Sequence, residues 1–372
     1  MVATAETLIA QARAETGFTD LGADSWQEGL DQMLRAVETD VHDPDAVARI
    51  ERILTDRLVL RLRIEDWYAH HGDEAVHPVE SPLFIVGLPR TATTAIHYLL
   101  SLDPQLRYLR TWERDAPLPP PDPRTEDTDP RRKSVERSEM HIRTVDGPAE
   151  DGPLQMLDFR SGHALPLPTY KLWWESTRHP TGLAYQDRVL RLLHSHRPPY
   201  RWLLKYPDYA FQLDELVDLY PDAKFIWTHR DPLKVIPSTC SVMVDGTRRR
   251  IPDWEPDDWS AFGHSVLDRF SEAARRASES RAKLGDGRFL DVGQPEMDAD
   301  PVVVGERIHD FAGLPVSAEL RQAMADWAES NRRGSRGAHV YSAEQYGLTD
   351  DEIREAFADY LRDYGAICSP DI

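Results

Sequence analysis

The sequence predicts a three-layer α/β fold, in which a central parallel sheet is flanked by helices and preceded by a helical segment. Short apolar runs alternate with segments of helical period along most of the chain. Short apolar strands that are separated by helices are typical of a parallel sheet covered on both faces. The expected strands are LFIVGL (83–88), RWLLKY (201–206), AKFIWTHR (223–230) and GRFLDV (287–292).

The first 75 residues show apolar positions three and four apart, which predicts helices. The three periodic stretches are AETLIAQARAETG (5–17), SWQEGLDQMLRAVETD (25–40) and the longer run at 46–71. We therefore expect two parts: a helical segment at 1–78 that packs on the core, and an α/β domain at 79–372.

Composition excludes several classes of protein. The 372 residues carry a formal net charge of −20, so long-range fields would repel nucleic acid and anionic membranes. No apolar run is long enough to span a bilayer. Two cysteines, Cys240 and Cys368, support neither a disulfide framework nor a cysteine-built zinc site. The first residues lack the pattern of a signal peptide, so we expect a cytoplasmic enzyme.

Two segments differ in composition from the rest. The stretch at 116–132, APLPPPDPRTEDTDPRR, is rich in proline and acid, and the stretch at 244–263 contains two tryptophans. Neither shows a helical or strand period, so both are expected to be surface loops. Each is either a lid over a substrate or a solvated connection.

The strand at 83–88 runs into a short loop and then a helix, over residues 87–94. Such a junction exposes unpaired backbone N–H groups at the positive end of a helix dipole, which suits an anion. The loop adds the hydroxyls of Thr93 and Thr94 and the guanidinium of Arg90. A nucleoside triphosphatase would place Gly-Lys-Ser/Thr here, and that lysine is absent. Taken alone, the loop is equally consistent with an incidental turn capped by threonines.

A second segment makes the anion site more specific. In WTHRDPLKVIPS, Arg230 ends a predicted strand, Pro232 is placed to start a helix, and Ser238 follows Arg230 by eight residues. An arginine and a hydroxyl at this spacing can converge on one further phosphate. A lone Arg-Asp-Pro is usually a strand end with a salt-bridged arginine, but together with the anion loop it indicates a second phosphate contact.

These two segments resemble the PAPS-dependent sulfotransferases, in particular the bacterial branch. FIVGLPRTATT (84–94) is similar to that family's loop for the 5′-phosphosulfate, and FIWTHRDPLKVIPS (225–238) to its segment for the 3′-phosphate. The resemblance extends to TGFTDLGADSWQEGL, LLSLDPQLR…TWE, RWLLKYP and AEQYGLTDDEIREAFADYL, and so covers most of the chain. It implies a P-loop-type fold.

The resemblance also implies a sulfuryl donor and the residues that bind it. The donor is 3′-phosphoadenosine 5′-phosphosulfate (PAPS), the product is PAP, and no metal is required. A late loop, RRGSRG at 332–337, resembles a phosphate-contacting loop of relatives, although a solvated charge run is the commoner explanation. The implied nucleotide contacts are Arg90, Thr91, Ala92, Thr93 and Thr94 at the 5′ end, Arg230 and Ser238 at the 3′-phosphate, and Arg336 from the late loop.

The sequence departs from the family pattern at two positions. Ala92 stands where members usually have glycine, and Tyr206 stands where serine commonly follows the lysine. Alanine fits the loop if its φ is negative, so we expect a negative φ at Ala92. Tyr206 is expected to narrow the pocket.

Sulfuryl transfer requires that charge on the leaving phosphate be stabilised and that the acceptor lose a proton. Arg90 is the candidate for the first task, assisted by Lys205 at a strand end, unless Lys205 is a surface residue. Glu113 lies 23 residues after Arg90, similar to the catalytic glutamate of glycan sulfotransferases, and is the candidate base. Alternatively Glu113 pairs structurally with Arg90 or Arg110. His141 is the rival base.

The acceptor is the least determined partner. Ten tryptophans, several of them in YKLWWES (170–176) and DWEPDDW, suit a hydroxyl or amine acceptor that is an apolar or aromatic natural product or a lipid, although aromatic residues are more often core. Two other functions remain as alternatives: a P-loop nucleotide kinase or triphosphatase, which would normally carry a Walker lysine, and a non-catalytic nucleotide-binding scaffold of the same fold.

Overall fold

The computed structural model describes residues 2–133, 144–162, 165–197, 200–248, 254–331 and 342–369. The chain divides into two compact units. The first comprises Met1–Glu80, Tyr108–Arg201 and Glu215–Pro221, and the second comprises Ser81–Arg107, Trp202–Asp214 and Asp222–Ile372. The domain boundary expected after residue 78 stays a prediction. No helix within the described ranges is long and apolar enough to cross a membrane.

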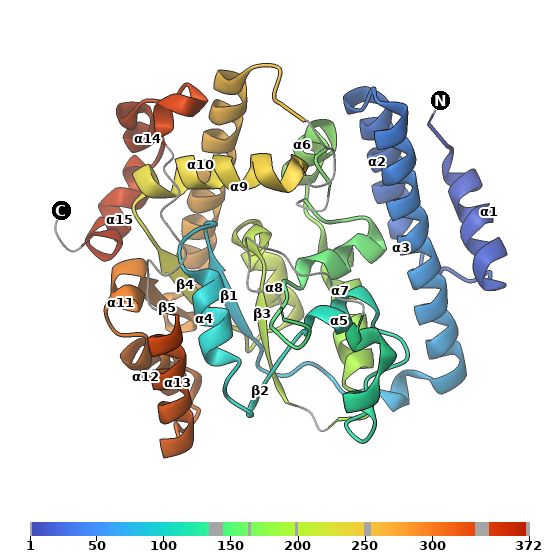
Figure 1. Cartoon of the computed structure of the whole chain (residues 1–372), viewed down its shortest axis with the longest axis horizontal. Coiled ribbons are helices and arrows are strands. Elements are labelled where there is room, and N and C mark those ends of the chain that lie inside the picture. The colour runs from blue at the N-terminus through green and yellow to red at the C-terminus, as the bar shows by residue number, and fades with distance from the viewer. Residues whose placement is uncertain are drawn as a thin grey trace. The chain divides into compact units, whose positions relative to one another are not determined.

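The first unit begins with the three helices that the period predicts (Figure 1, blue). Capping residues fix the ends of the first of these helices. At its N-terminus the hydroxyl of Thr4 accepts a hydrogen bond from the backbone N–H of Thr7, and at its C-terminus Gly17 adopts a left-handed φ of 74°. The helices are α1 (Ala5–Thr16), α2 (Trp26–Asp40) and α3 (Pro44–His71); the unit also contains α5 (Thr111–Asp115), α6 (Pro168–Ser176), α7 (Pro180–Leu193) and most of α8 (Leu213–Leu219).

The second unit is built on a five-stranded sheet with the order β2-β3-β1-β4-β5 (Figure 1). Strand β1 pairs in parallel with β3 and β4, and β4 pairs in parallel with β5. The predicted α/β class is therefore confirmed, and the short edge strand β2 is an addition that the sequence did not indicate. The strands are β1 (Leu83–Gly87), β2 (Leu106–Tyr108), β3 (Arg201–Lys205), β4 (Lys224–His229) and β5 (Phe289–Gly293).

Helices cover both faces of this sheet. One face carries Leu83, Ile85 and Ile226, which pack with buried side chains of α4 and α12. The other carries a row of stacked rings, with Phe84 5.7 Å from Phe225, which in turn lies 4.9 Å from Phe289. The helices of this unit are α4 (Thr93–Leu100), α9 (Pro232–Arg248), α10 (Trp259–Leu284), α11 (Gln294–Ala299), α12 (Pro301–Ala312), α13 (Ala318–Ser330), α14 (Asp350–Ala356) and α15 (Ala358–Cys368).

The proline-rich stretch at 116–132 is a folded loop in the first unit. Arg131 donates to the carbonyls of Ala116 and Pro119 and lies 4.8 Å from the ring of Trp112. Two short 3₁₀ helices, Glu126–Thr128 and Pro130–Lys133, lie toward the end of this segment, and the guanidinium of Arg131 holds it in place by donating to carbonyls and stacking on an indole. The expectation that 244–263 is a loop was wrong at both ends, because residues 244–248 belong to α9 and residues 259–263 to α10; residues 249–253 are outside the described ranges. Whether either segment is a lid stays a prediction.

A buried ion pair joins α12 to the turn after α4. His309 contacts Asp103 through Nε2 at 3.0 Å and the carbonyl of Gly305 through Nδ1 at 2.7 Å. Burial alone would lower the pKa of His309, but its hydrogen bonds with Asp103 and Gly305 raise it above the usual 6.5. Because both partners accept, the histidine is held as an imidazolium.

This pair predicts a pH dependence of stability. A raised pKa in the folded state stabilises the fold fully below pH 6.5, and that contribution is lost as the pH rises through the folded-state value. In urea unfolding between pH 5.5 and 9, the difference in free energy of unfolding between the wild type and His309→Gln is expected to shrink with rising pH. A difference that stays constant, or grows, would contradict the assignment.

Candidate active site

The anion loop begins at a glycine that no other residue could replace without strain. Gly87 has a φ of 139°, and a Cβ there would lie 2.3 Å from Oγ1 of Thr228 on β4. Thr91 then anchors the loop from the other side, since its buried hydroxyl lies 2.6 Å from the carbonyl of Leu88 and 2.6 Å from the hydroxyl of Thr228. Thr228 therefore pins the loop to the neighbouring strand, a role that the sequence did not indicate.

Two non-glycine residues of the loop adopt the left-handed conformation. The φ of Arg90 is 69° and that of Ala92 is 72°. The expectation of a negative φ at Ala92 was wrong, because Ala92 is the residue that turns the chain into α4: its carbonyl accepts the first helical bond, from Ile96 at 3.0 Å. Left-handed turns of this kind gather successive N–H groups around an anion.

Ala92→Gly is therefore expected to stabilise the protein. A left-handed alanine costs about 1–2 kcal/mol, of which the extra unfolded-state entropy of glycine offsets about 0.4–1 kcal/mol. We expect a gain of roughly 0.5–1 kcal/mol in the free energy of unfolding, measured in urea. Ala95→Gly, three residues later inside α4, is the matched control and should lose about 1 kcal/mol. Equal losses in both variants would contradict the strain at Ala92.

The structure brings the two predicted phosphate segments into direct contact within the second unit. Arg90 Nε donates to Ser238 Oγ at 3.0 Å, and Arg230 Nη1 donates to the carbonyl of Arg90 at 2.9 Å. Pro232 begins α9 as expected, and this helix carries Ser238. Arg230 and Ser238 are buried, whereas Arg90 is exposed. The guanidinium of Arg90 is thus at the surface of a site whose other members are fixed beneath it.

Lys205 lies at the carboxyl end of β3, which runs parallel to β1, so it lies at the same edge of the sheet as the anion loop. Its Nζ donates to Thr94 Oγ1 at 3.4 Å, and the residue is only 6% exposed, so it is not a surface lysine. Thr94 itself is exposed at the first turn of α4. Tyr206, the next residue after Lys205, is buried and packs edge-on against Tyr209 with ring centroids 5.7 Å apart.

Glu113 is completely buried in the first unit, on α5. One carboxylate oxygen accepts from the backbone N–H of Arg110 at 3.0 Å, and the other accepts from its guanidinium at 2.5 Å. Arg110 also donates to Glu126, which in turn accepts from Arg197. Arg110 is thus one of the two arginines named as alternative structural partners of Glu113.

Charge in this cluster is balanced by opposite charge. Burial alone would lower the pKa of Arg110, but Glu113 and Glu126 outweigh it and raise the value. Burial would likewise raise the pKa of Glu126, but hydrogen bonds from Arg110 and Arg197 lower it to about 2. Arg110 and Glu126 are therefore both charged throughout the physiological pH range. His141 and Arg336, the two remaining candidates, lie outside the described residues.

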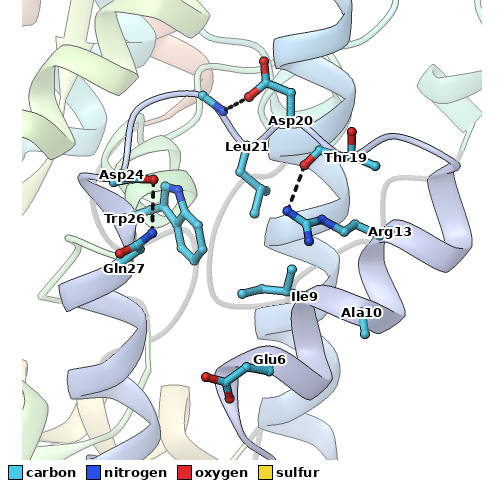
Figure 2. Close-up of a pocket in the computed structure, with 11 residues that line it drawn as sticks. Glu6, Ile9, Ala10, Arg13, Thr19, Asp20, Leu21, Asp24, Trp26 and Gln27 are labelled. Atoms are coloured by element: carbon cyan, nitrogen blue, oxygen red, sulfur yellow. Dashed lines mark hydrogen bonds between the residues drawn. The ribbon is translucent and has the colours of Figure 1, made fainter.

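A separate cavity of about 650 Å³ lies in the first unit, between α1, the following loop and the start of α2 (Figure 2). Its only arginine, Arg13, already donates to the carbonyl of Thr19 at 3.0 Å, and its carboxylates are Glu6, Asp20 and Asp24. None of the predicted site residues lines it. An excess of acid makes this cavity unsuited to a phosphate.

Comparison with known proteins decides the family. The profile described as the sulfotransferase family matches residues 82–318, more than half of the chain and the whole span from β1 to the start of α13. The chain belongs to the sulfotransferase family. The predicted family is thereby confirmed, and the kinase and triphosphatase alternative is disfavoured.

Solved structures extend the likeness over the whole sulfotransferase chain. The crystal structure of sulfotransferase STF9 from Mycobacterium avium is 31% identical, with a TM-score of 0.88, and the match covers 97% of each chain. Sulfotransferase STF1 from Mycobacterium tuberculosis H37Rv is 27% identical, with a TM-score of 0.82, over 96% of this chain and 99% of that one.

Among curated proteins, the sulfotransferase is similar to omega-hydroxy-beta-dihydromenaquinone-9 sulfotransferase Stf3 of Mycobacterium bovis and of Mycobacterium tuberculosis. Each match is 25% identical over 162 residues, or 42% of this chain. It spans only 40% of the length of these relatives.

Proposed function

We propose that this chain transfers a sulfuryl group from PAPS to the hydroxyl, or amine, of a small-molecule acceptor. The observation that carries the proposal is the convergence of Arg90, Arg230 and Ser238 at the β1–α4 loop. Two arginines, a hydroxyl and a helix N-terminus make a donor set for more than one anionic group. A nucleotide phosphorylated at both ends of its ribose fits this set.

The described residues divide between the two ends of the nucleotide. The N–H groups of the loop at 91–94, with Arg90, are proposed to bind the 5′ end, and Arg230 with Ser238 to bind the 3′-phosphate. Since the hydroxyl of Thr91 is bonded to Leu88 and Thr228, its proposed contribution is its N–H alone. Arg336 stays a proposed additional contact.

When bound, PAPS supplies an activated sulfuryl group. Two side chains are proposed to stabilise the charge that develops during its transfer, and a third is proposed to act as the base. Arg90, exposed beside the loop, stabilises negative charge on the leaving phosphate, and Lys205, held at Thr94, assists. Because these cations and the N–H groups supply the charge stabilisation, the transfer is proposed to need no metal.

Glu113 is proposed as the base that accepts the proton of the acceptor, with His141 as the rival. Its chain position, 23 residues after Arg90, supports this role. Its salt bridge with Arg110 fixes the carboxylate in one orientation, which favours a positioned base. The same salt bridge is what a purely structural glutamate would make, so a matched pair of variants is needed to separate the two roles.

The acceptor is proposed to be an apolar molecule with a hydroxyl group. Stf3, by its name, acts on an omega-hydroxylated dihydromenaquinone, and the tryptophan-rich composition of this chain suits an acceptor of that kind. A nucleic acid partner is not expected at a net charge of −20. The cytoplasmic location stays a prediction.

Two assays test the function. PAP is expected to raise the melting temperature without metal, whereas ATP with magnesium is not. With 35S-labelled PAPS and a panel of hydroxylated lipids and phenols, label should move to at least one acceptor at the same rate with and without EDTA. Stabilisation by magnesium ATP but not by PAP would instead support the kinase alternative.

A further inference from the structure

His229 directly precedes Arg230 and is fully buried at the end of β4. Its Nε2 lies 2.9 Å from Asp291 Oδ1 on β5, and its Nδ1 lies 2.8 Å from the hydroxyl of Tyr360 on α15. Successive strand residues point to opposite faces, so His229 faces away from Thr228, which pins the anion loop. The two ring nitrogens of His229 thus connect the end of β4 to β5 and to α15.

The chemistry of the partners fixes where each proton lies. Arg281 donates to both oxygens of Asp291, at 2.6 and 2.9 Å. Burial alone would raise the pKa of Asp291, but hydrogen bonds from His229 and Arg281 lower it to about 2. An ionised carboxylate only accepts, so Nε2 of His229 carries a hydrogen.

The other ring nitrogen must then accept. Burial lowers the pKa of His229 below 6.5, so the ring is neutral and Nδ1 is unprotonated. Burial also holds the pKa of Tyr360 well above its usual value, so its hydroxyl keeps the proton that it donates to Nδ1. The thiol of Cys368 in turn donates to Tyr360 at 3.9 Å. The chain of bonds runs in one direction, from α15 to the carboxylate on β5.

We infer that His229 is a positioning residue for the nucleotide site: its bonds to Asp291 and Tyr360 fix the end of β4 and, through the backbone, the guanidinium of Arg230. Helix α15 then supports the nucleotide site from a distance, since none of the proposed nucleotide contacts lies on it. The inference rests on the proposed function for the identity of the ligand, and it adds the C-terminal helix to the residues on which affinity depends.

The expected consequence is on affinity rather than on chemistry. Arg230 also holds the carbonyl of Arg90, so a loosened strand end would relax the fit at both ends of the nucleotide. The side chain of Arg90 keeps its own bond to Ser238, and Lys205 keeps its bond to Thr94, so the groups proposed for the transfer step are unchanged once PAPS is saturating. A loss of the Tyr360 bond should therefore raise KM for PAPS and Kd for PAP while kcat stays nearly constant.

Tyr360→Phe and Tyr364→Phe make a matched pair for the test. Both residues lie on α15, and Tyr364 stacks on the same histidine at 4.6 Å, so each variant loses one hydroxyl and keeps its ring. By calorimetry with PAP, Tyr360→Phe is expected to raise Kd by about 3- to 10-fold, and Tyr364→Phe by less than about 2-fold. The kcat at saturating PAPS should stay within about 2-fold of the wild type in both variants.

His229→Gln supplies the second arm, because its amide keeps a donor for Asp291 but has no acceptor at the position of Nδ1, which binds Tyr360. Combined with Tyr360→Phe it should raise Kd no further than the larger single effect, since both variants remove the same bond between Tyr360 and His229. Additive effects, or equal Kd values for Tyr360→Phe and the wild type, would overturn the inference alone. A wild type that binds no PAP would overturn the proposed function, and this inference with it.

Discussion

Glu113→Gln is expected to lower kcat by about 10²- to 10⁴-fold, the usual contribution of a general base. Affinity for PAP should stay within about 2-fold of the wild type, because a glutamine oxygen can still accept from the backbone N–H of Arg110 and keep the start of α5. Single-turnover kinetics with labelled PAPS and calorimetry with PAP measure the two effects separately.

Glu126→Gln is the matched control for this variant. Glu126 binds the same guanidinium nitrogen of Arg110 at 2.7 Å, so its replacement removes a carboxylate from the same arginine without touching the proposed base. It should retain at least about a third of the wild-type kcat, since the proposed base and its salt bridge with Arg110 are left in place. If both variants lost turnover equally, Glu113 would have only the structural role of holding Arg110. If Glu113→Gln kept its turnover, His141 would become the base to test.

Arg230→Gln is expected to weaken PAP binding by about 30- to 150-fold, which corresponds to about 2–3 kcal/mol for a charge-assisted contact with a phosphate. AMP lacks the 3′-phosphate, so the substitution should weaken AMP binding far less than PAP binding. The variant should therefore bind PAP and AMP with similar affinity. Calorimetry with PAP and AMP on the wild type and on Arg230→Gln gives the coupling free energy between Arg230 and the 3′-phosphate directly.

The control for this cycle is Arg321→Gln, which removes the same charge from an exposed residue on α13. Its affinities for both nucleotides should match those of the wild type within about 2-fold. A loss for Arg230→Gln that was equal for PAP and AMP would mean that Arg230 only supports the carbonyl of Arg90. The 3′-phosphate would then have to be assigned elsewhere.

Much of the fold followed from the apolar pattern. The strands at 83–88, 201–206 and 223–230 each contain consecutive apolar residues, namely LFIV, WLL and FIW, and such short apolar strands are typical of a sheet covered by helices on both faces. The three-residue strand β2 escaped prediction because LRY at 106–108 is too short and too polar to carry a period. Its pairing depends on the neighbouring strand rather than on its own residues.

The sequence predicted which residues make up the candidate site, but not the backbone conformation of its loop or the partner of each side chain. Arg90, Arg230 and Ser238 could be predicted to meet because strand ends in a parallel sheet share one edge. The sign of φ at Ala92 could not, since it depends on how Thr228 and Thr91 hold the loop. Nor could the choice of Arg110 as the partner of Glu113, because two arginines were equally plausible until the chain was folded.

A crystal structure with PAP bound tests the central claim most directly. The prediction is a 5′-phosphate on the N–H groups at 91–94 beside Arg90, and a 3′-phosphate within hydrogen-bonding distance of both Arg230 and Ser238. Well-ordered PAP bound elsewhere, with these two residues still turned toward Arg90 and away from any phosphate, would contradict it.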